Sequence, residues 1–178
     1  MPATLEGVPS DLQTRKISFV FRAMDGDGDG VLRRSDFDLL ADRWAAVRGG
    51  AHEERMRETL RAWWEALYAT SDQDGDGGVT ASELMSAVDG DGTMIDLVVA
   101  TAVAMFEAVD SDGDGRVSEA EYAQLVRAWT GGTSVHAFAR LDLDGDGYLS
   151  KQEFARHWLE FWAGDDEDAP GTYVFGEV

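Results

Sequence analysis

The chain has 178 residues, enough for one domain or two small joined lobes, and 44% of them are hydrophobic, which permits a sizeable core. Its net charge of −20 disfavours nucleic acids and anionic membrane surfaces as partners, because both carry negative charge themselves. The sequence contains no cysteine, which excludes disulfides, thiolate zinc sites and a cysteine nucleophile.

The first segment, residues 1–10, lacks the basic start and apolar run of a signal peptide, and we expect it to be a mobile N-terminus. No stretch of the chain approaches the roughly 20 apolar residues that a membrane helix needs. These features predict a cytoplasmic protein without a membrane partner, and we expect a monomer.

A motif, Asp-x-Asp-Gly-Asp-Gly, then occurs four times. Each copy is followed by an aliphatic residue two positions after its last glycine and by an acid four positions further on. The pattern predicts four loops of twelve residues, at 25–36, 72–83, 110–121 and 142–153.

Apolar residues recur at helical spacing on the flanks of these loops, and we interpret them as the core faces of helices. These stripes comprise Ile17, Val20, Phe21 and Met24; Phe37, Leu40, Trp44 and Val47; Met56, Leu60, Trp63, Trp64 and Leu67; Val99, Ala102, Phe106 and Val109; Tyr122, Leu125, Val126 and Trp129; and Phe154, Trp158 and Phe161. The sequence therefore predicts an all-α fold of four helix–loop–helix units.

We expect the units to form two pairs, over residues 11–88 and 94–163, with a connector at 89–93 and an acidic and apolar tail at 164–178. The connector starts like a fifth loop, but Met94 occupies the position of the required glycine, so we count four sites. The aliphatic residue of each loop suits a short β-bridge to its partner loop, which would couple the filling of paired sites.

The loops carry the oxygen donors that calcium prefers. Ca²⁺ takes six to eight oxygens at about 2.3–2.6 Å, and such loops supply them from positions 1, 3, 5 and 12 and from the carbonyl of position 7, around a bend at a glycine in position 6. The predicted side-chain ligands are Asp25, Asp27, Asp29 and Asp36; Asp72, Asp74, Asp76 and Glu83; Asp110, Asp112, Asp114 and Glu121; and Asp142, Asp144, Asp146 and Glu153. The predicted carbonyl ligands belong to Val31, Gly78, Arg116 and Tyr148.

The first loop differs from the other three. Those loops have Thr or Ser at position 9 and Glu at position 12, the spacing of a helix capping box. The first has Arg33 and Asp36 instead, so it lacks an oxygen at position 9 and carries a shorter terminal acid. We predict that it binds calcium most weakly, and that Mg²⁺ competes most strongly there.

The repeat between Asp11 and Trp162 resembles the EF-hand superfamily. Successive loops start 47, 38 and 32 residues apart, and this uneven spacing is similar to that of sarcoplasmic calcium-binding proteins and their bacterial relative calerythrin. The resemblance implies that two EF-hand pairs pack face to face in one compact globule, and that the protein buffers or stores calcium. It also implies that the apolar residues 173–175 tuck between the lobes, whereas the sequence alone is equally consistent with a frayed tail.

The residues leave three functions to compare. A calcium sensor opens a flexible, Met-rich groove for a target protein, but the six methionines here are scattered and the apolar stripes are aromatic, which favours a buffer with a permanent core. Photoproteins share the architecture and hold a luciferin in the core. If this chain did the same, His136, His157, Trp158 and Tyr173 would be the residues that contact the luciferin. No catalytic or organic-cofactor site is otherwise indicated.

Overall fold

The structure is a computed structural model that describes residues 9–48, 53–88, 93–133 and 136–176. The predicted mobile residues 1–8 and most of the predicted connector, 89–92, lie outside these ranges. Helices dominate the described part of the chain, and strands occur only as two short pairs. No described helix is both long and apolar enough to span a membrane.

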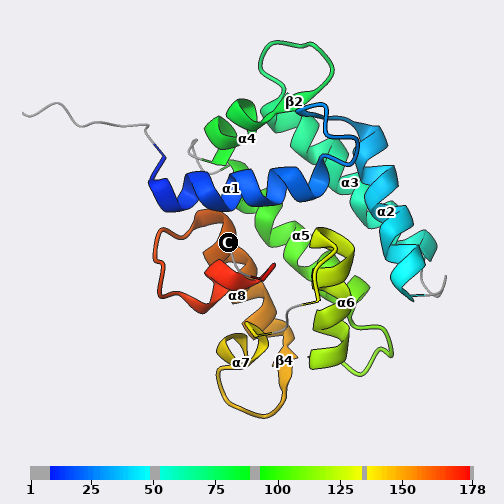
Figure 1. The fold of residues 1–178 in the computed structure, drawn as a ribbon, viewed down its shortest axis with the longest axis vertical. Helices are drawn as coiled ribbons and strands as arrows, with labels where there is room; N and C mark the ends of the chain where they lie inside the picture. Colours follow the sequence, from blue (N-terminus) through cyan, green and yellow to red (C-terminus); the bar gives the residue numbers. More distant parts are fainter. Residues whose placement is uncertain (1–8, 49–52, 89–92, 134–135, 177–178) are drawn as a thin grey trace, which may run out of the picture.

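The helices and strands follow one another in the order of four helix–loop–helix units (Figure 1). They are α1 (Asp11–Met24), β1 (Val31–Leu32), α2 (Arg34–Arg48), α3 (Glu53–Ser71), β2 (Val79–Thr80), α4 (Ala81–Val88), α5 (Thr93–Val109), β3 (Arg116–Ser118), α6 (Glu119–Thr130), α7 (Phe138–Leu141), β4 (Tyr148–Ser150), α8 (Lys151–Ala163) and the 3₁₀-helix η1 (Pro170–Tyr173). We call α1–α4 the first pair and α5–α8 the second pair. The incoming helix of the fourth unit, α7, has only four residues.

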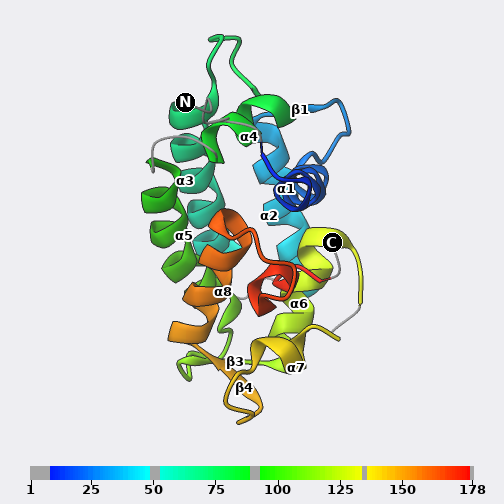
Figure 2. The ribbon, with the colours of Figure 1, turned by 90° about the vertical axis from the view of Figure 1, so that its left-hand side faces the viewer.

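The predicted β-bridges are present. Leu32 pairs with Val79 between β1 and β2, and Val117 pairs with Leu149 between β3 and β4, both antiparallel. All four side chains are fully buried, so each bridge ties two loops together and closes one end of the core. The two loop pairs lie at opposite ends of the long axis of the molecule (Figure 2).

Sequence-encoded caps fix where several helices begin and end. Ser10 accepts a hydrogen bond from the Gln13 N–H and starts α1, while Ser118 and Ser150 form complete capping boxes with Glu121 and Glu153. Gly131 ends α6 with φ of 71°, a left-handed conformation that favours glycine. The predicted capping boxes of the third and fourth loops are therefore confirmed.

One aromatic cluster joins the two pairs into a common core. Trp63 of α3 packs against three tryptophans of the second pair, with ring centroids 5.3 Å from Trp129, 6.0 Å from Trp158 and 5.9 Å from Trp162. Helix α5 packs between α3 and α8, so the two pairs share one interior (Figure 2). This is the face-to-face packing that the resemblance implied.

Two basic side chains also bridge the pairs. Lys16 of α1 is fully buried and donates to the carbonyl oxygens of Glu160 (3.2 Å) and Gly164 (2.6 Å) at the end of α8. Arg43 of α2 donates to the carbonyl oxygens of Ala23 (2.6 Å) and Trp129 (3.2 Å). Each cation satisfies carbonyl groups near the C-terminus of a helix, where its charge is favourable.

The expected core face of α5 was partly wrong. Val99 is 52% exposed, and it lies on the outer side of α5 with Ile95 and Val103. The buried side is formed by Val98, Ala102, Met105, Phe106 and Val109. Helical spacing fits Val98 as well as Val99, and the packing of α3 and α8 on this helix decides between them.

The C-terminal segment packs back onto the second pair. Val174 and Phe175 are buried, and the Phe175 ring lies 4.8 Å from both Trp129 and Phe161. The tail is therefore packed, and not frayed, over residues 170–176. Its ring contacts are with the second pair, and the position between the lobes that the resemblance implied stays a prediction. In the exposed acidic run before it, Asp165 accepts a hydrogen bond from Ser10 and Glu167 pairs with Arg15, so this run contacts α1.

Candidate metal centre

The four loops share one backbone framework. In each, the position-1 carboxylate accepts hydrogen bonds from the N–H groups of the glycines at positions 4 and 6; in the third loop these are Gly113 (2.8 Å) and Gly115 (3.0 Å), both bonded to Asp110. The position-5 carboxylate accepts from the N–H of position 7, as Asp114 does from Arg116 (2.8 Å). These bonds wrap the chain around the carboxylates.

The glycines at positions 4 and 6 have positive φ in every loop. Gly28 has φ of 73° and Gly30 of 84°, and the other three loops repeat these values closely. A residue with a Cβ is strained there, so the bend requires glycine. The bend at the position-6 glycine was predicted from the motif, whereas the role of the position-4 glycine was not, although glycine recurs there in all four copies.

The position-12 acid closes each loop. Glu121 accepts from the N–H of Ser111 (2.7 Å) through one oxygen and from the N–H of Ser118 (2.9 Å) through the other, so it links both ends of the third loop. Asp36 bonds equivalently to Gly26 (2.9 Å) and Arg33 (2.8 Å), and its side chain is buried. The shorter acid of the first loop therefore still reaches both ends of the loop.

Hydrogen bonding lowers the pKa of the three glutamates at position 12. Bonds from Thr80 lower the pKa of the Glu83 carboxyl. Burial works to raise the pKa of Glu121 and of Glu153, but bonds from Ser111 and Ser118 in one case, and from Ser150 and Leu143 in the other, outweigh it and lower both. A carboxylate that stays charged is the form that binds a cation.

The structure brings three acids of each loop together, with oxygens that all lie within 4.8 Å of one another. The groups are Asp25, Asp27 and Asp36; Asp72, Asp74 and Asp76; Asp110, Asp112 and Glu121; and Asp142, Asp144 and Glu153. The remaining predicted acids, Asp29, Glu83, Asp114 and Asp146, belong to the same loops but not to these groups. Because the donors are all hard oxygens, the sets fit Ca²⁺ or Mg²⁺.

Two of the position-5 acids face an arginine. Arg33 pairs with Asp29 inside the first loop, and together with the Val31 N–H, which contributes most, it lowers the pKa of Asp29. Arg116 of the third loop lies 3.9 Å from Asp146 of the fourth and stacks over Tyr148 at 5.3 Å. Arg33 was expected to weaken the first site because it offers no oxygen, and the pairing of its charge with the predicted ligand Asp29 was not predicted.

Three of the four residues considered for luciferin binding already form hydrogen bonds within the protein. His157 is buried and donates from Nε2 to the Leu141 carbonyl oxygen (2.6 Å), while its Nδ1 lies 3.3 Å from Glu160. Trp158 donates to Thr101 (3.3 Å), and Tyr173 donates to the Glu167 carbonyl oxygen (3.1 Å). His136 is exposed and lines a small surface hollow with Tyr173. Each of the first three already has a partner within the protein.

Comparison with known proteins identifies the family to which these loops belong. The family model described as "EF hand" matches residues 102–126 and 135–156. Calmodulin-like protein 2 of Arabidopsis thaliana is 32% identical over 112 residues, 63% of this chain and 67% of its own. The sarcoplasmic calcium-binding protein of Hediste diversicolor is 28% identical over 64% of this chain and 67% of its own. Calcium-dependent protein kinase 13 of Arabidopsis thaliana is 28% identical, but the chain spans only 22% of its length.

Solved structures share the whole architecture. Calcium-loaded apo coelenterazine-binding protein from Renilla muelleri matches with a TM-score of 0.75 and 21% identity, over 96% of this chain and 100% of its own. A sarcoplasmic calcium-binding protein from amphioxus gives 0.74 and 18%, over 96% and 100%. A Streptomyces coelicolor calcium-binding protein gives 0.70 and 28%, over 86% and 99%.

The loops, the paired helices and these matches define a calcium-binding protein of the EF-hand superfamily, and the chain belongs to that superfamily. Within it, the four-unit fold with a shared core resembles the sarcoplasmic calcium-binding proteins.

Proposed function

We propose that the chain is a calcium buffer that holds up to four ions, one in each loop. The ligands of this proposal are the sixteen carboxylates and four carbonyl groups predicted from the sequence. Its first support is the loop framework, which gathers three acids in each loop and lowers the pKa of the position-12 glutamates Glu83, Glu121 and Glu153. We expect the first loop to be the weakest for calcium and the most open to Mg²⁺.

The shared core is the observation that favours a buffer. A sensor exposes an apolar groove when calcium binds. Here, such opening would separate Trp63 from the tryptophans of the second pair and leave Lys16 and Arg43 without the carbonyl groups that they bridge. Breaking these contacts is costly, so calcium is expected to fill the loops with little change of shape.

A calcium sensor is the second candidate. Its support is the Streptomyces coelicolor protein, which is described as acting in prokaryotic calcium-mediated regulation and is 28% identical to this chain. A luciferin-binding role has less support, because His157, Trp158 and Tyr173 are already bonded within the protein. Absorbance after incubation with coelenterazine tests that role directly.

Calorimetric titration with calcium, with and without millimolar magnesium, combined with small-angle scattering of both states, tests the proposal. A buffer predicts several bound ions, weaker binding in magnesium, and scattering curves that superimpose. Marked expansion on calcium binding, or calcium-dependent capture of an amphipathic target helix, would instead establish the sensor.

A further inference from the structure

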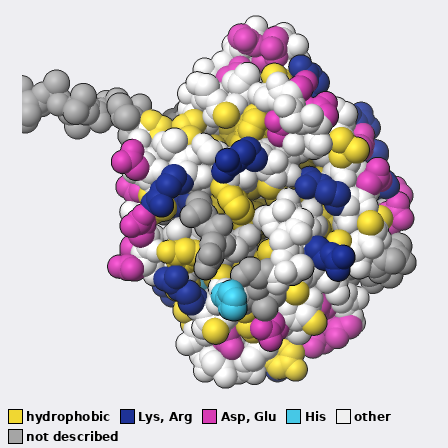
Figure 3. All heavy atoms as spheres, in the orientation of Figure 1, with side chains coloured by type: hydrophobic (Ala, Val, Ile, Leu, Met, Phe, Trp, Pro, Cys, Tyr) yellow, Lys and Arg dark blue, Asp and Glu magenta, His cyan; other side chains and the backbone are white. Residues whose placement is uncertain are grey.

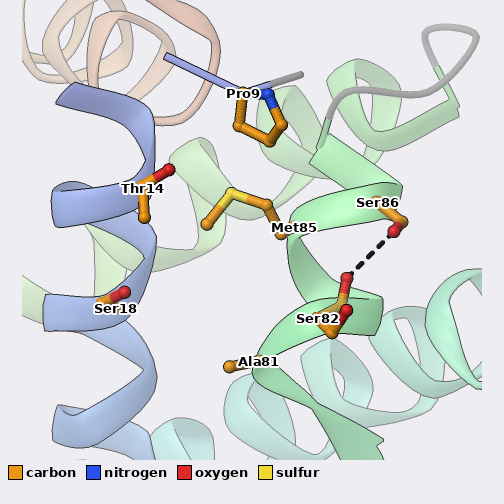
Figure 4. Close-up of a pocket in the computed structure, with 7 residues that line it drawn as sticks. All are labelled: Pro9, Thr14, Ser18, Ala81, Ser82, Met85 and Ser86. Atoms are coloured by element: carbon orange, nitrogen blue, oxygen red, sulfur yellow. Dashed lines mark hydrogen bonds between the residues drawn. The ribbon is translucent and has the colours of Figure 1, made fainter. Parts of the chain in front are cut away.

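The fourth helix–loop–helix unit is built differently from the second, its counterpart in the first pair. The helix that enters the second loop, α3, has 19 residues, whereas the helix that enters the fourth loop, α7, has four. The outgoing helices also differ. A hollow of about 570 Å³ lies beside α4, with Met85 pointing into it toward α1 (Figure 4), whereas the C-terminal segment packs on α8. The fourth loop therefore combines a very short incoming helix with an outgoing helix that carries an additional segment.

The C-terminal tail supplies contacts that α7 cannot make by itself. A helix of four residues is not stable alone, and among the described residues no side chain caps its N-terminus. The structure describes the tail over residues 164–176, and its 3₁₀-helix η1 packs on both α7 and α8. The Arg140 guanidinium of α7 lies over the Tyr173 ring, 4.1 Å from its centroid. The Tyr122 hydroxyl of α6 donates to the Tyr173 carbonyl oxygen (3.2 Å), so the tail joins α7 to both α6 and α8.

Gly171 lets the tail lie directly on α8. Its N–H donates to the Glu160 carboxylate (3.0 Å). A Cβ on Gly171 would lie 2.5 Å from the His157 carbonyl oxygen and 2.5 Å from the Glu160 Cβ, so a larger residue would push the tail away from the helix. Substitution of this glycine therefore displaces the tail without removing any side chain.

His157 connects the tail to the start of the fourth loop. Its side chain is fully buried, and its Nε2 donates to the Leu141 carbonyl oxygen (2.6 Å). Leu141 is the last residue of α7 and precedes Asp142, the first predicted ligand of the loop. The other ring nitrogen, Nδ1, lies 3.3 Å from the same Glu160 oxygen that accepts from Gly171. A continuous path of contacts thus runs from the tail to the calcium loop.

The tail is also tied to α1, away from the fourth loop. Lys16 donates to the Gly164 carbonyl oxygen (2.6 Å), and Arg15 pairs with Glu167. On the face that the tail crosses, Lys and Arg side chains lie around the centre and Asp and Glu mostly at the edges (Figures 1 and 3), which suits an acidic segment. The start of the tail is therefore held independently of α7, and residues 170–176 make its contacts with the fourth unit.

We infer that the tail is a working part of the fourth calcium site: its docking positions α7 and, through Glu160 and His157, the residue that precedes the first ligand of the loop. Calcium in the fourth loop and docking of residues 170–176 therefore favour each other, because coupling between two sites is reciprocal. His157 is a positioning residue, since it acts on the loop through the Leu141 carbonyl group. The inference rests on the proposed calcium function and gives the tail a role beyond packing.

Calcium titration of the isotopically labelled full chain, followed by NMR, tests the inference one loop at a time. The N–H of each position-6 glycine bonds to the position-1 carboxylate, so its resonance reports an ion in that loop. These glycines are Gly30, Gly77, Gly115 and Gly147. Gly171→Ala should weaken calcium binding at the fourth loop by about fivefold or more, and at the loops of the first pair by less than about twofold.

Gly132→Ala is the matched control for this substitution. It makes the same change in the connection between α6 and α7, and among the described residues the new Cβ would meet only the Thr130 hydroxyl oxygen, at 3.0 Å. It should change calcium binding at the fourth loop by less than about twofold.

Substitutions of His157 separate positioning from packing. His157→Leu removes the donor to the Leu141 carbonyl oxygen and should weaken the fourth loop by about fivefold or more. His157→Gln retains an N–H donor and should recover most of the affinity. Thr101→Val is the control for general destabilisation, because it removes a buried hydrogen bond from Trp158 of α8 in which the tail takes no part. It should leave the affinity of the fourth loop relative to the first pair unchanged.

Hydrogen exchange of the tail tests the reverse direction. The N–H groups of Val174 and Gly176 donate to carbonyl oxygens within the tail (3.1 and 2.9 Å). In saturating calcium, Glu153→Gln, which alters a predicted ligand of the fourth loop, should speed their exchange by about fivefold or more. Glu83→Gln, the same change in the second loop, should alter it by less than about twofold. This measurement needs no substitution in the tail, so it tests the coupling even if Gly171→Ala does not fold.

Three results would overturn the inference: equal effects of Gly171→Ala and Gly132→Ala on the fourth loop, equal effects of His157→Leu and Thr101→Val, or tail exchange that does not respond to Glu153→Gln. A Gly147 resonance that does not shift with calcium in the wild type would refute the calcium site itself. A Gly147 resonance that shifts in the wild type and titrates identically in the tail and His157 variants would refute only the coupling.

Discussion

Replacing Trp63 by alanine should destabilise both EF-hand pairs together. The Trp63 side chain is 3% exposed and contacts Phe37 in its own pair and Trp129, Trp158 and Trp162 in the other. Its removal leaves a cavity where the pairs meet, and truncation of a buried tryptophan costs about 3–5 kcal/mol. The upper part of this range is expected, because aromatic pairs add about 0.5–1.5 kcal/mol each beyond their buried area.

Urea denaturation in saturating calcium measures this loss. The wild type should unfold in one transition, and Trp63→Ala should move the midpoint to lower urea with little change in slope. Tyr68→Ala is a matched control on α3, because Tyr68 is 39% exposed and packs on Trp64 alone among the described aromatic residues; it should cost less than about 1 kcal/mol. A loss below about 1 kcal/mol for Trp63→Ala, or separate transitions for the two pairs in the wild type, would refute the shared core.

Three further predictions concern the loops and the bridging lysine. Chelation should lower the melting temperature, because each empty loop gathers like charges that a bound cation neutralises; superimposable melts would contradict this. Arg33→Ser should tighten calcium binding at the first site about tenfold, because it removes the cation beside Asp29 and places a capping serine at position 9. The Gly30 amide resonance reports binding at this site, and Arg34→Ser is the charge-matched control. Equal effects of the two substitutions would count against the role of Arg33. Burial lowers the pKa of Lys16 from 10.5 to about 8, so between pH 8 and 10.5 the folded state binds fewer protons than the unfolded state. The stability of the wild type relative to Lys16→Met should therefore rise by on the order of 1–3 kcal/mol as pH increases through this window. A difference in stability that does not change with pH would contradict the lowered pKa of Lys16.

Features encoded within one loop could be predicted from the sequence. The glycine at position 6 and the capping pair Ser118 and Glu121 follow from spacing within a loop and were predicted correctly. The bridge between Val117 and Leu149 joins two loops, and it was predicted from the aliphatic residue that each loop carries at position 8. Three acids of each loop also come together as the motif implies, whereas the complete ligand set remains a prediction.

Features that depend on distant neighbours could not be predicted. Helical periodicity placed Val99 inside, because only the packing of α3 and α8 shows which side of α5 is covered. Trp63 was recognised as a core residue, but its place between the pairs depends on residues more than sixty positions away. The pairing of Arg33 with Asp29 depends on side-chain conformation, which residue spacing does not specify.

Equilibrium dialysis against labelled calcium, at free concentrations spanning the roughly 10⁻⁹ to 10⁻³ M range of EF-hand sites, tests the central claim most directly. Four clusters of carboxylates predict a plateau of four ions per chain, with the last ion bound most weakly. A plateau at one ion or fewer would contradict the account.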